Sequence, residues 1–144
     1  MSDNRCAVAR ALDVIGDWWS LLIVREAMYG KRRFNEFQKT LGLAKNILAS
    51  RLRKLVECGV LEAVAATSNA SHKEYVLTGK GEKLYIVMIA LYQWGSEHCF
   101  TPGEQPIALV DSAHEAPLRP LQLRSQDDRL LGARDIKVLG NPRE

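Results

Sequence analysis

The sequence is poor in the residue types from which most catalytic sites are built. Its 144 residues include only three histidines and three cysteines. His72, His98 and His114 are far apart, and none lies beside a cysteine or serine in a nucleophile arrangement. There is also no glycine-rich phosphate loop and no histidine–glutamate spacing of the kind found in metal enzymes. We therefore expect no catalytic activity, no cofactor and no metal site.

The scarcity of cysteine and of long apolar runs bears on where the protein works. Cys6, Cys58 and Cys99 are odd in number and widely spaced, which matches neither a disulfide framework nor a zinc motif. The N-terminus carries Asp3 and lacks the apolar segment of a signal peptide, and no apolar run approaches membrane-spanning length. The expectation is a cytoplasmic protein with reduced thiols and no membrane partner.

Acidic residues are scarce in one segment of a chain that is otherwise mildly charged. The net charge is only +3, and a hydrophobic fraction of 47% is enough for a folded core. Residues 31–58, however, carry eight basic and two acidic side chains. A small helical segment with this bias suits the major groove of DNA. Residues 101–144 are slightly acidic by comparison, with six basic and seven acidic side chains.

The order of the predicted elements defines a fold class. Apolar spacing and turn residues predict helices over 5–15, 18–29, 36–41 and 45–58, strands over 60–64 and 73–77, and a long helix over 79–98. Asp17 and Asn35 are the expected N-caps of the second and third helices. We interpret this order as a mainly α fold with a small β-hairpin wing, a winged helix-turn-helix. Residues 1–100 would form the DNA-binding and dimerisation domain, and residues 101–144 a linker and a small β-rich C-terminal extension.

The helix predicted over 45–58 has two chemically different faces. One face is an apolar stripe of Ile47, Leu48, Leu52, Leu55 and Val56. The opposite face consists of Lys45, Asn46, Ala49, Ser50 and Arg53. The small residues in its middle permit close approach to a groove about 12 Å wide, in which asparagine commonly pairs with adenine and arginine with guanine. We predict that this face contacts bases.

A second set of basic residues is predicted to contact the DNA backbone. Arg32 and Arg33 precede the short third helix, and phosphate contacts from there would position the protein without specifying sequence. The turn cluster 67–71 is the expected tip of the wing. His72 and Lys73 would contact the backbone or the minor groove beside it.

Two other interpretations remain open at this stage. Any one of these basic residues, taken alone, is typical of a solvated helix face. The domain as a whole could instead be a winged-helix protein–protein interaction module without DNA binding, which should carry an apolar or acidic face on the helix 45–58. A salt series separates the two, because phosphate contacts release counterions and weaken steeply as salt rises.

The helix predicted over 79–98 has more apolar surface than one packing face requires. One face holds Leu84, Val87, Met88, Leu91 and Trp94, and a second holds Tyr85, Ile86, Ile89 and Tyr92. We predict a homodimer through this helix and the N-terminal helix, since the second apolar face would be exposed to solvent in a monomer. The alternative is a central buried helix. A small-molecule pocket lined by Trp18, Trp19, Tyr85 or Tyr92 is conceivable, although such residues are more often plain packing.

Several short motifs recur in the order and spacing of a known family. They are CAV at 6–8, LDVIGDWW at 12–19, RRFNEF at 32–37, LASRLRKL at 48–55, GVLE at 59–62, EYVLTGKG at 74–81 and WG at 94–95. In these the chain resembles the HxlR-type winged-helix transcriptional regulators, which are related to the MarR group. The resemblance implies a homodimer with paired recognition helices on a two-fold-related DNA operator. The chain departs from the family pattern at Ala7 and Trp18, and its wing is poorer in proline and arginine.

The resemblance also draws attention to Cys6. In some relatives the matching cysteine senses electrophiles or oxidants, and Arg5 and Arg10 would favour the reactive thiolate here. The alternative is an ordinary, small, partly buried cysteine. Some relatives carry a C-terminal extension with cysteine pairs, but residues 101–144 contain no cysteine, so the resemblance implies no metal site there.

Overall fold

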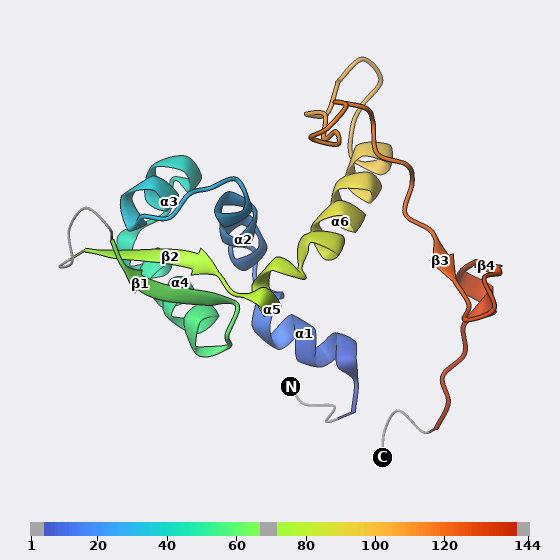
Figure 1. The fold of residues 1–144 in the computed structure, drawn as a ribbon, viewed down its shortest axis with the longest axis horizontal. Helices are drawn as coiled ribbons and strands as arrows, with labels where there is room; N and C mark the ends of the chain where they lie inside the picture. The colour runs from blue at the N-terminus through green and yellow to red at the C-terminus, as the bar shows by residue number, and fades with distance from the viewer. Residues whose placement is uncertain (1–4, 67–71, 141–144) are drawn as a thin grey trace. The chain divides into compact units, whose positions relative to one another are not determined.

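The computed structural model describes residues 5–66 and 72–140, and it is built mainly of helices with one prominent hairpin (Figure 1). The helices are α1 Ala7–Ile15, α2 Ser20–Met28, α3 Phe34–Leu41, α4 Lys45–Glu57, α5 Gly79–Glu82 and α6 Tyr85–His98. The strands are β1 Leu61–Ala65, β2 Lys73–Leu77, β3 Leu123–Arg124 and β4 Leu130–Leu131, and a 3-10 turn spans Ala133–Asp135. The predicted winged helix-turn-helix fold class is confirmed.

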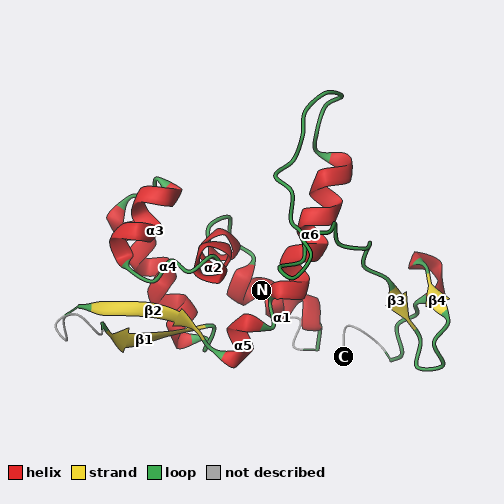
Figure 2. Ribbon diagram, turned by 45° about the horizontal axis from the view of Figure 1, so that its top comes forward, coloured by secondary structure: helices red, strands yellow, loops and turns green. Residues whose placement is uncertain are grey.

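The chain divides into two compact units within its last long helix. The first unit contains the residues up to Tyr85, and the second begins at Ile86. The core belongs to the first unit, where α2, α3 and α4 pack on one another and β1 packs on α4 (Figure 2). It consists of Ile23, Val24, Phe37, Leu43, Leu48, Leu52, Leu55, Val60 and Leu61. Helix α2 contributes two fully buried residues to this core, Ile23 and Val24.

Asp17 fixes the start of α2 and ties it to α4. Its Oδ2 accepts hydrogen bonds from the backbone N–H of Trp19 (3.2 Å) and of Ser20 (3.0 Å), which confirms the predicted capping role. Arg51 Nε of α4 lies 3.1 Å from the same oxygen, as an ion pair without hydrogen-bond alignment. Burial alone would raise the pKa of Asp17, but the hydrogen bonds from Ser20 and the charge of Arg51 outweigh it and hold the pKa below 3.8.

The turn between α3 and α4 depends on Gly42. Its φ of 68° lies in the left-handed region, which glycine adopts without strain, and its N–H donates to the carbonyl of Gln38. The Gln38 side chain in turn donates to the carbonyl of Leu43 (3.3 Å), and Leu43 is buried. The predicted cap at Asn35 is wrong: α3 already includes it, and the Glu36 carboxylate accepts the N–H of Arg33 instead.

The wing is an antiparallel hairpin whose register runs from Leu61 opposite Leu77 to Ala65 opposite Lys73. Its predicted tip, residues 67–71, lies outside the described residues. The backbone N–H of Tyr75 donates to the carbonyl of Arg32 at 2.7 Å, so the segment before α3 runs beside β2. The wing is thereby attached to the segment before α3, and its strand β1 packs on α4.

The helix predicted over 79–98 is broken in two, which corrects the sequence analysis. Gly81 packs so closely on the backbone of Val60 that a Cβ there would lie 2.1 Å from the Val60 carbonyl oxygen. After it, Leu84 N–H donates to the Gly81 carbonyl at 3.1 Å and the Leu84 side chain turns into the core. Helix α5 ends at Glu82, where these contacts are made, and α6 begins only at Tyr85.

The second unit lacks a core of its own. No residue between 86 and 140 is buried. The predicted small β element of the C-terminal extension is the short antiparallel pair β3–β4, which the 3-10 turn Ala133–Asp135 follows. Among the described residues, no helix has the length and apolarity needed to cross a membrane.

Candidate nucleic-acid interface

The exposed face of α4 is the one that the sequence predicts. Leu48, Leu52 and Leu55 are fully buried and hold one side of the helix against the core. The opposite side carries Lys45, Asn46, Ser50 and Arg53, all exposed, with Ala49 half-buried between them. Ile47, predicted to belong to the apolar stripe, is 39% exposed and lies at its edge. Burial of a leucine face therefore orients the polar face outward.

The polar groups of this face are not engaged elsewhere. Within the part of the chain that the structure describes, Lys45, Asn46, Ser50 and Arg53 form no ion pair and no side-chain hydrogen bond. Ala44 precedes the helix and offers no side-chain cap. The first N–H groups of α4 are thus left to an outside acceptor, and the helix dipole favours a negative one.

Arg32 and Arg33 are in a different situation from the residues of α4. Arg32 Nε lies 2.6 Å from Glu74 Oε2, and Arg33 Nε lies 3.7 Å from Glu74 Oε1. Glu74 is buried on β2, whereas both arginine side chains are about half exposed. The carboxylate offsets part of their positive charge and orients their guanidinium groups, so a phosphate contact from Arg32 would have to share it with Glu74.

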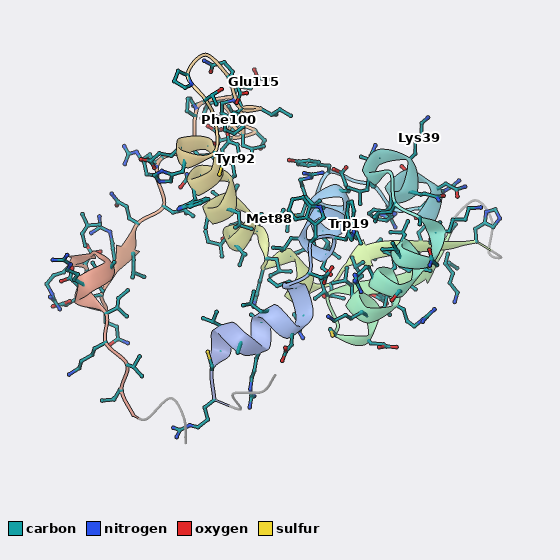
Figure 3. The ribbon with its side chains drawn as sticks, turned by 180° about the vertical axis from the view of Figure 1, so that it is seen from behind. Trp19, Lys39, Met88, Tyr92, Phe100 and Glu115 are labelled. Atoms are coloured by element: carbon teal, nitrogen blue, oxygen red, sulfur yellow. The ribbon has the colours of Figure 1, made fainter. Side chains whose placement is uncertain are left out.

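A surface groove brings together three of the residues predicted to touch the DNA backbone. Its volume is about 350 Å³, and it is lined by Arg33, Phe34, Asn35, His72, Lys73 and Tyr75. The start of β2, beside the tip of the wing, therefore faces the start of α3, and the groove offers two cations, a histidine and an amide to an anion. Lys39 of the same helix points away from the protein (Figure 3).

Two members of this region were missed by the sequence analysis. Asn35 lines the groove and does not cap a helix, because α3 begins at Phe34 and includes it. Glu74 occupies an inward position of β2, between exposed Lys73 and half-buried Tyr75. An acidic residue at an inward strand position, with two arginines elsewhere in the domain, is the signal that predicts such an ion pair.

The other predicted site residues are placed as follows. Cys6 is half-buried at the N-cap of α1, where its Sγ accepts the N–H of Ala9 at 3.4 Å.

The predicted pocket of aromatic residues does not form as a unit. Trp19 packs on the core while Trp18 is exposed, and the cavity of about 510 Å³ that Tyr85 lines includes neither tryptophan. Among the described residues, no group of histidine, cysteine and acidic side chains is placed to hold a metal ion.

Comparisons with known proteins show which family the chain resembles. The sequence model of the HxlR-like helix-turn-helix family matches residues 14–102. The HTH-type transcriptional regulator Rv3095 of Mycobacterium tuberculosis is 43% identical over 103 residues, which are 72% of this chain and 65% of that protein, slightly under two thirds of its length.

Solved structures show the same similarity in three dimensions. PA1607, a candidate transcription factor, has a TM-score of 0.91 and 52% identity, with 96% of each chain covered. The transcriptional regulator YodB of Bacillus subtilis in its reduced form has a TM-score of 0.58 and 29% identity, covering 69% of this chain and 98% of that one. YodB has also been solved bound to quinone and after treatment with diamide.

Proposed function

The chain belongs to the HxlR-like helix-turn-helix family of transcriptional regulators, whose members are not enzymes, and we propose that it binds operator DNA as a homodimer in the cytoplasm. The observation that carries this proposal is the exposed polar face of α4 above three fully buried leucines. A helix held in this way can enter the major groove without disturbing the core behind it.

In this proposal the residues of α4 divide into two roles. Asn46, Ser50 and Arg53 read base edges, with Ala49 small enough to let the helix approach. Lys45 and the uncapped N–H groups at the start of α4 hold a phosphate. Arg33, His72 and Lys73 bind a further stretch of backbone from the groove beside the start of β2, and Arg32, held by Glu74, supports Arg33 there.

A second copy of the chain accounts for the apolar surface of α6. Its 14 residues include none that is buried, and Tyr85, Ile86, Leu91 and Trp94 are exposed. In water such a helix exposes apolar area that a symmetric partner would cover. Pairing through α6, with α1 alongside, would present two copies of α4 to a two-fold-related operator.

Selection of bound fragments from genomic or random duplex DNA, followed by titration across a salt series, tests this function. The proposal predicts one enriched, two-fold-related sequence and a steep linear loss of log affinity with log salt. A protein–protein module with the same fold would enrich no sequence and show little binding at any salt, and that result would refute the proposal.

A response to oxidants is a second candidate, supported by Cys6 and by YodB. Diamide oxidises thiols, and YodB adopts solved reduced and diamide-treated states. Cys6 is half-buried at the start of α1, so oxidation of its sulfur would disturb the hydrogen bond from Ala9. An oxidant should lower the operator affinity of the wild-type protein and of Cys99→Ala, but not of Cys6→Ala. A Cys6→Ala protein that still responds would eliminate Cys6 as the sensor.

A further inference from the structure

The second unit is ordered without a core. Its described residues, 86–140, include none that is buried, although fixing the backbone of each residue costs conformational entropy. Natural domains offset this cost by burying apolar side chains. An ordered segment of this length with nothing buried in its own chain is therefore expected to bury its apolar side chains against another molecule.

The C-terminal segment is attached to α6 by specific hydrogen bonds. The Gln93 side chain accepts the N–H of Leu121 at 2.8 Å and donates to the carbonyl of Arg119 at 3.0 Å. On the preceding residue of α6, the hydroxyl oxygen of Tyr92 accepts the N–H of Leu109 at 3.1 Å (Figure 3). The root of the segment, residues 119–121, is thus fixed on α6.

Beyond this root, residues 122–140 form an extended segment that we call the arm. Its turns are held by side chains that bond to backbone: Ser125 Oγ accepts the N–H of Arg129 at 2.9 Å, and Asp135 Oδ2 accepts the N–H of Gly132 at 2.8 Å. These bonds order the arm before it meets anything else. A segment that is already held in one conformation loses less conformational entropy when it binds.

The apolar side chains of the arm are exposed to solvent. Leu123, Leu130, Ile136, Val138 and Leu139 are all at least half exposed, and Leu139 is 91% exposed. PA1607 matches this chain over 96% of its length, so the extension is not peculiar to one sequence. Charged residues of both signs lie between the apolar ones, with Asp127, Asp128 and Asp135 among four cations. That mixture does not suit a polyanion such as DNA.

We propose that the arm packs its apolar side chains on a second copy of this chain, and so extends the dimer contact that begins at α6. The inference rests on the proposed homodimer. Two exposed apolar surfaces, that of α6 and that of the arm, belong to the same unit, and Gln93 of α6 bonds to residues 119 and 121, directly before the arm. A symmetric pair covers both at once, because each copy supplies the surface that the other needs.

The test measures the dissociation constant of the full-length dimer by sedimentation velocity. Replacing Ile136 and Val138 together by aspartate should raise Kd about tenfold or more, since losing the burial of one such side chain weakens association by roughly that factor. Gln126→Asp, in the exposed polar turn of the same arm, should leave Kd unchanged. Leu91→Asp in α6 should also weaken the dimer.

A second measurement asks which molecule the arm touches. A benzophenone amino acid at position 138 should form, on irradiation, an adduct between two chains that doubles the mass on a denaturing gel. An adduct confined to one chain, or an unchanged Kd for the Ile136/Val138 variant while Leu91→Asp still breaks the dimer, would overturn the arm contact and leave the homodimer intact. A wild-type protein that is monomeric at all concentrations would overturn both.

Discussion

Arg32 Nε lies 2.6 Å from Glu74 Oε2, and this ion pair joins the segment before α3 to the second strand of the wing. The backbone adds a second link, since Tyr75 N–H donates to the Arg32 carbonyl. Because Arg33 lies beside the same carboxylate, Glu74 orients both arginines at the groove where wing and helix-turn-helix meet. Arg32 thus supports the fold, whereas Arg53 on α4 is available to DNA.

Replacing each of these two arginines by alanine should separate the two roles. Arg32→Ala leaves the buried Glu74 carboxylate with a weaker partner and should lower the free energy of unfolding by about 1–2 kcal/mol. Arg53→Ala removes an exposed side chain without a partner in the described chain and should change the free energy of unfolding by less than about 0.5 kcal/mol. Urea denaturation measures both, and equal losses would contradict this division.

The contribution of Lys45 to DNA binding should appear in the salt dependence. Because Lys45 holds a phosphate in this proposal, Lys45→Ala should reduce the slope of log affinity against log salt by about one per binding subunit. Lys83→Ala removes an equal charge after α5, away from α4, and serves as the control. Identical slopes for both variants would show that α4 does not meet the backbone there.

Asp17 should make stability sensitive to acid. Its pKa is held below 3.8 in the folded protein, so its contribution is complete above pH 3.8 and is lost as the pH falls through the folded pKa. Asp17→Asn should lower stability by about 1 kcal/mol at neutral pH and flatten its decline below about pH 4. The exposed Asp13→Asn on α1 is the matched control. Chemical denaturation at several pH values measures the effect, and an unchanged acid slope would contradict it.

Two glycines in α5 test why the predicted long helix is broken. A Cβ at Gly81 would lie 2.1 Å from the Val60 carbonyl oxygen, whereas a Cβ at Gly79 would meet nothing within 4 Å. Gly81→Ala should therefore destabilise the protein by about 2 kcal/mol or more, and Gly79→Ala should be neutral or stabilising by up to about 1 kcal/mol. Thermal unfolding of the two variants tests this explanation. Similar melting temperatures would mean that the close contact at Gly81 does not end α5.

The sequence predicts this fold well where the pattern is periodic. Leu48, Leu52 and Leu55 recur at helical spacing, and that spacing alone identifies both the buried side of α4 and its exposed polar side. The break before α6 is not predictable in the same way. It depends on the approach of Gly81 to the backbone of Val60, a contact between segments that no local pattern records.

The candidate site is predicted less completely for a similar reason. The basic residues are visible in the sequence, but their partners are not. Glu74 lies 42 positions from Arg32, and only the pairing of β2 with the segment before α3 places them together. Asn35 resembles a cap until Glu36 is seen to take that role. Pairing between distant segments thus decides which cations remain available to DNA.

Hydroxyl-radical footprinting on the selected operator tests the central claim most directly, because it maps where paired copies of α4 meet DNA. The account predicts two protected stretches whose centres lie about 10 base pairs, or a multiple of that, apart, related by two-fold symmetry. Both should fade together in Arg53→Ala while the variant stays folded. A single protected stretch, or none, would contradict the account.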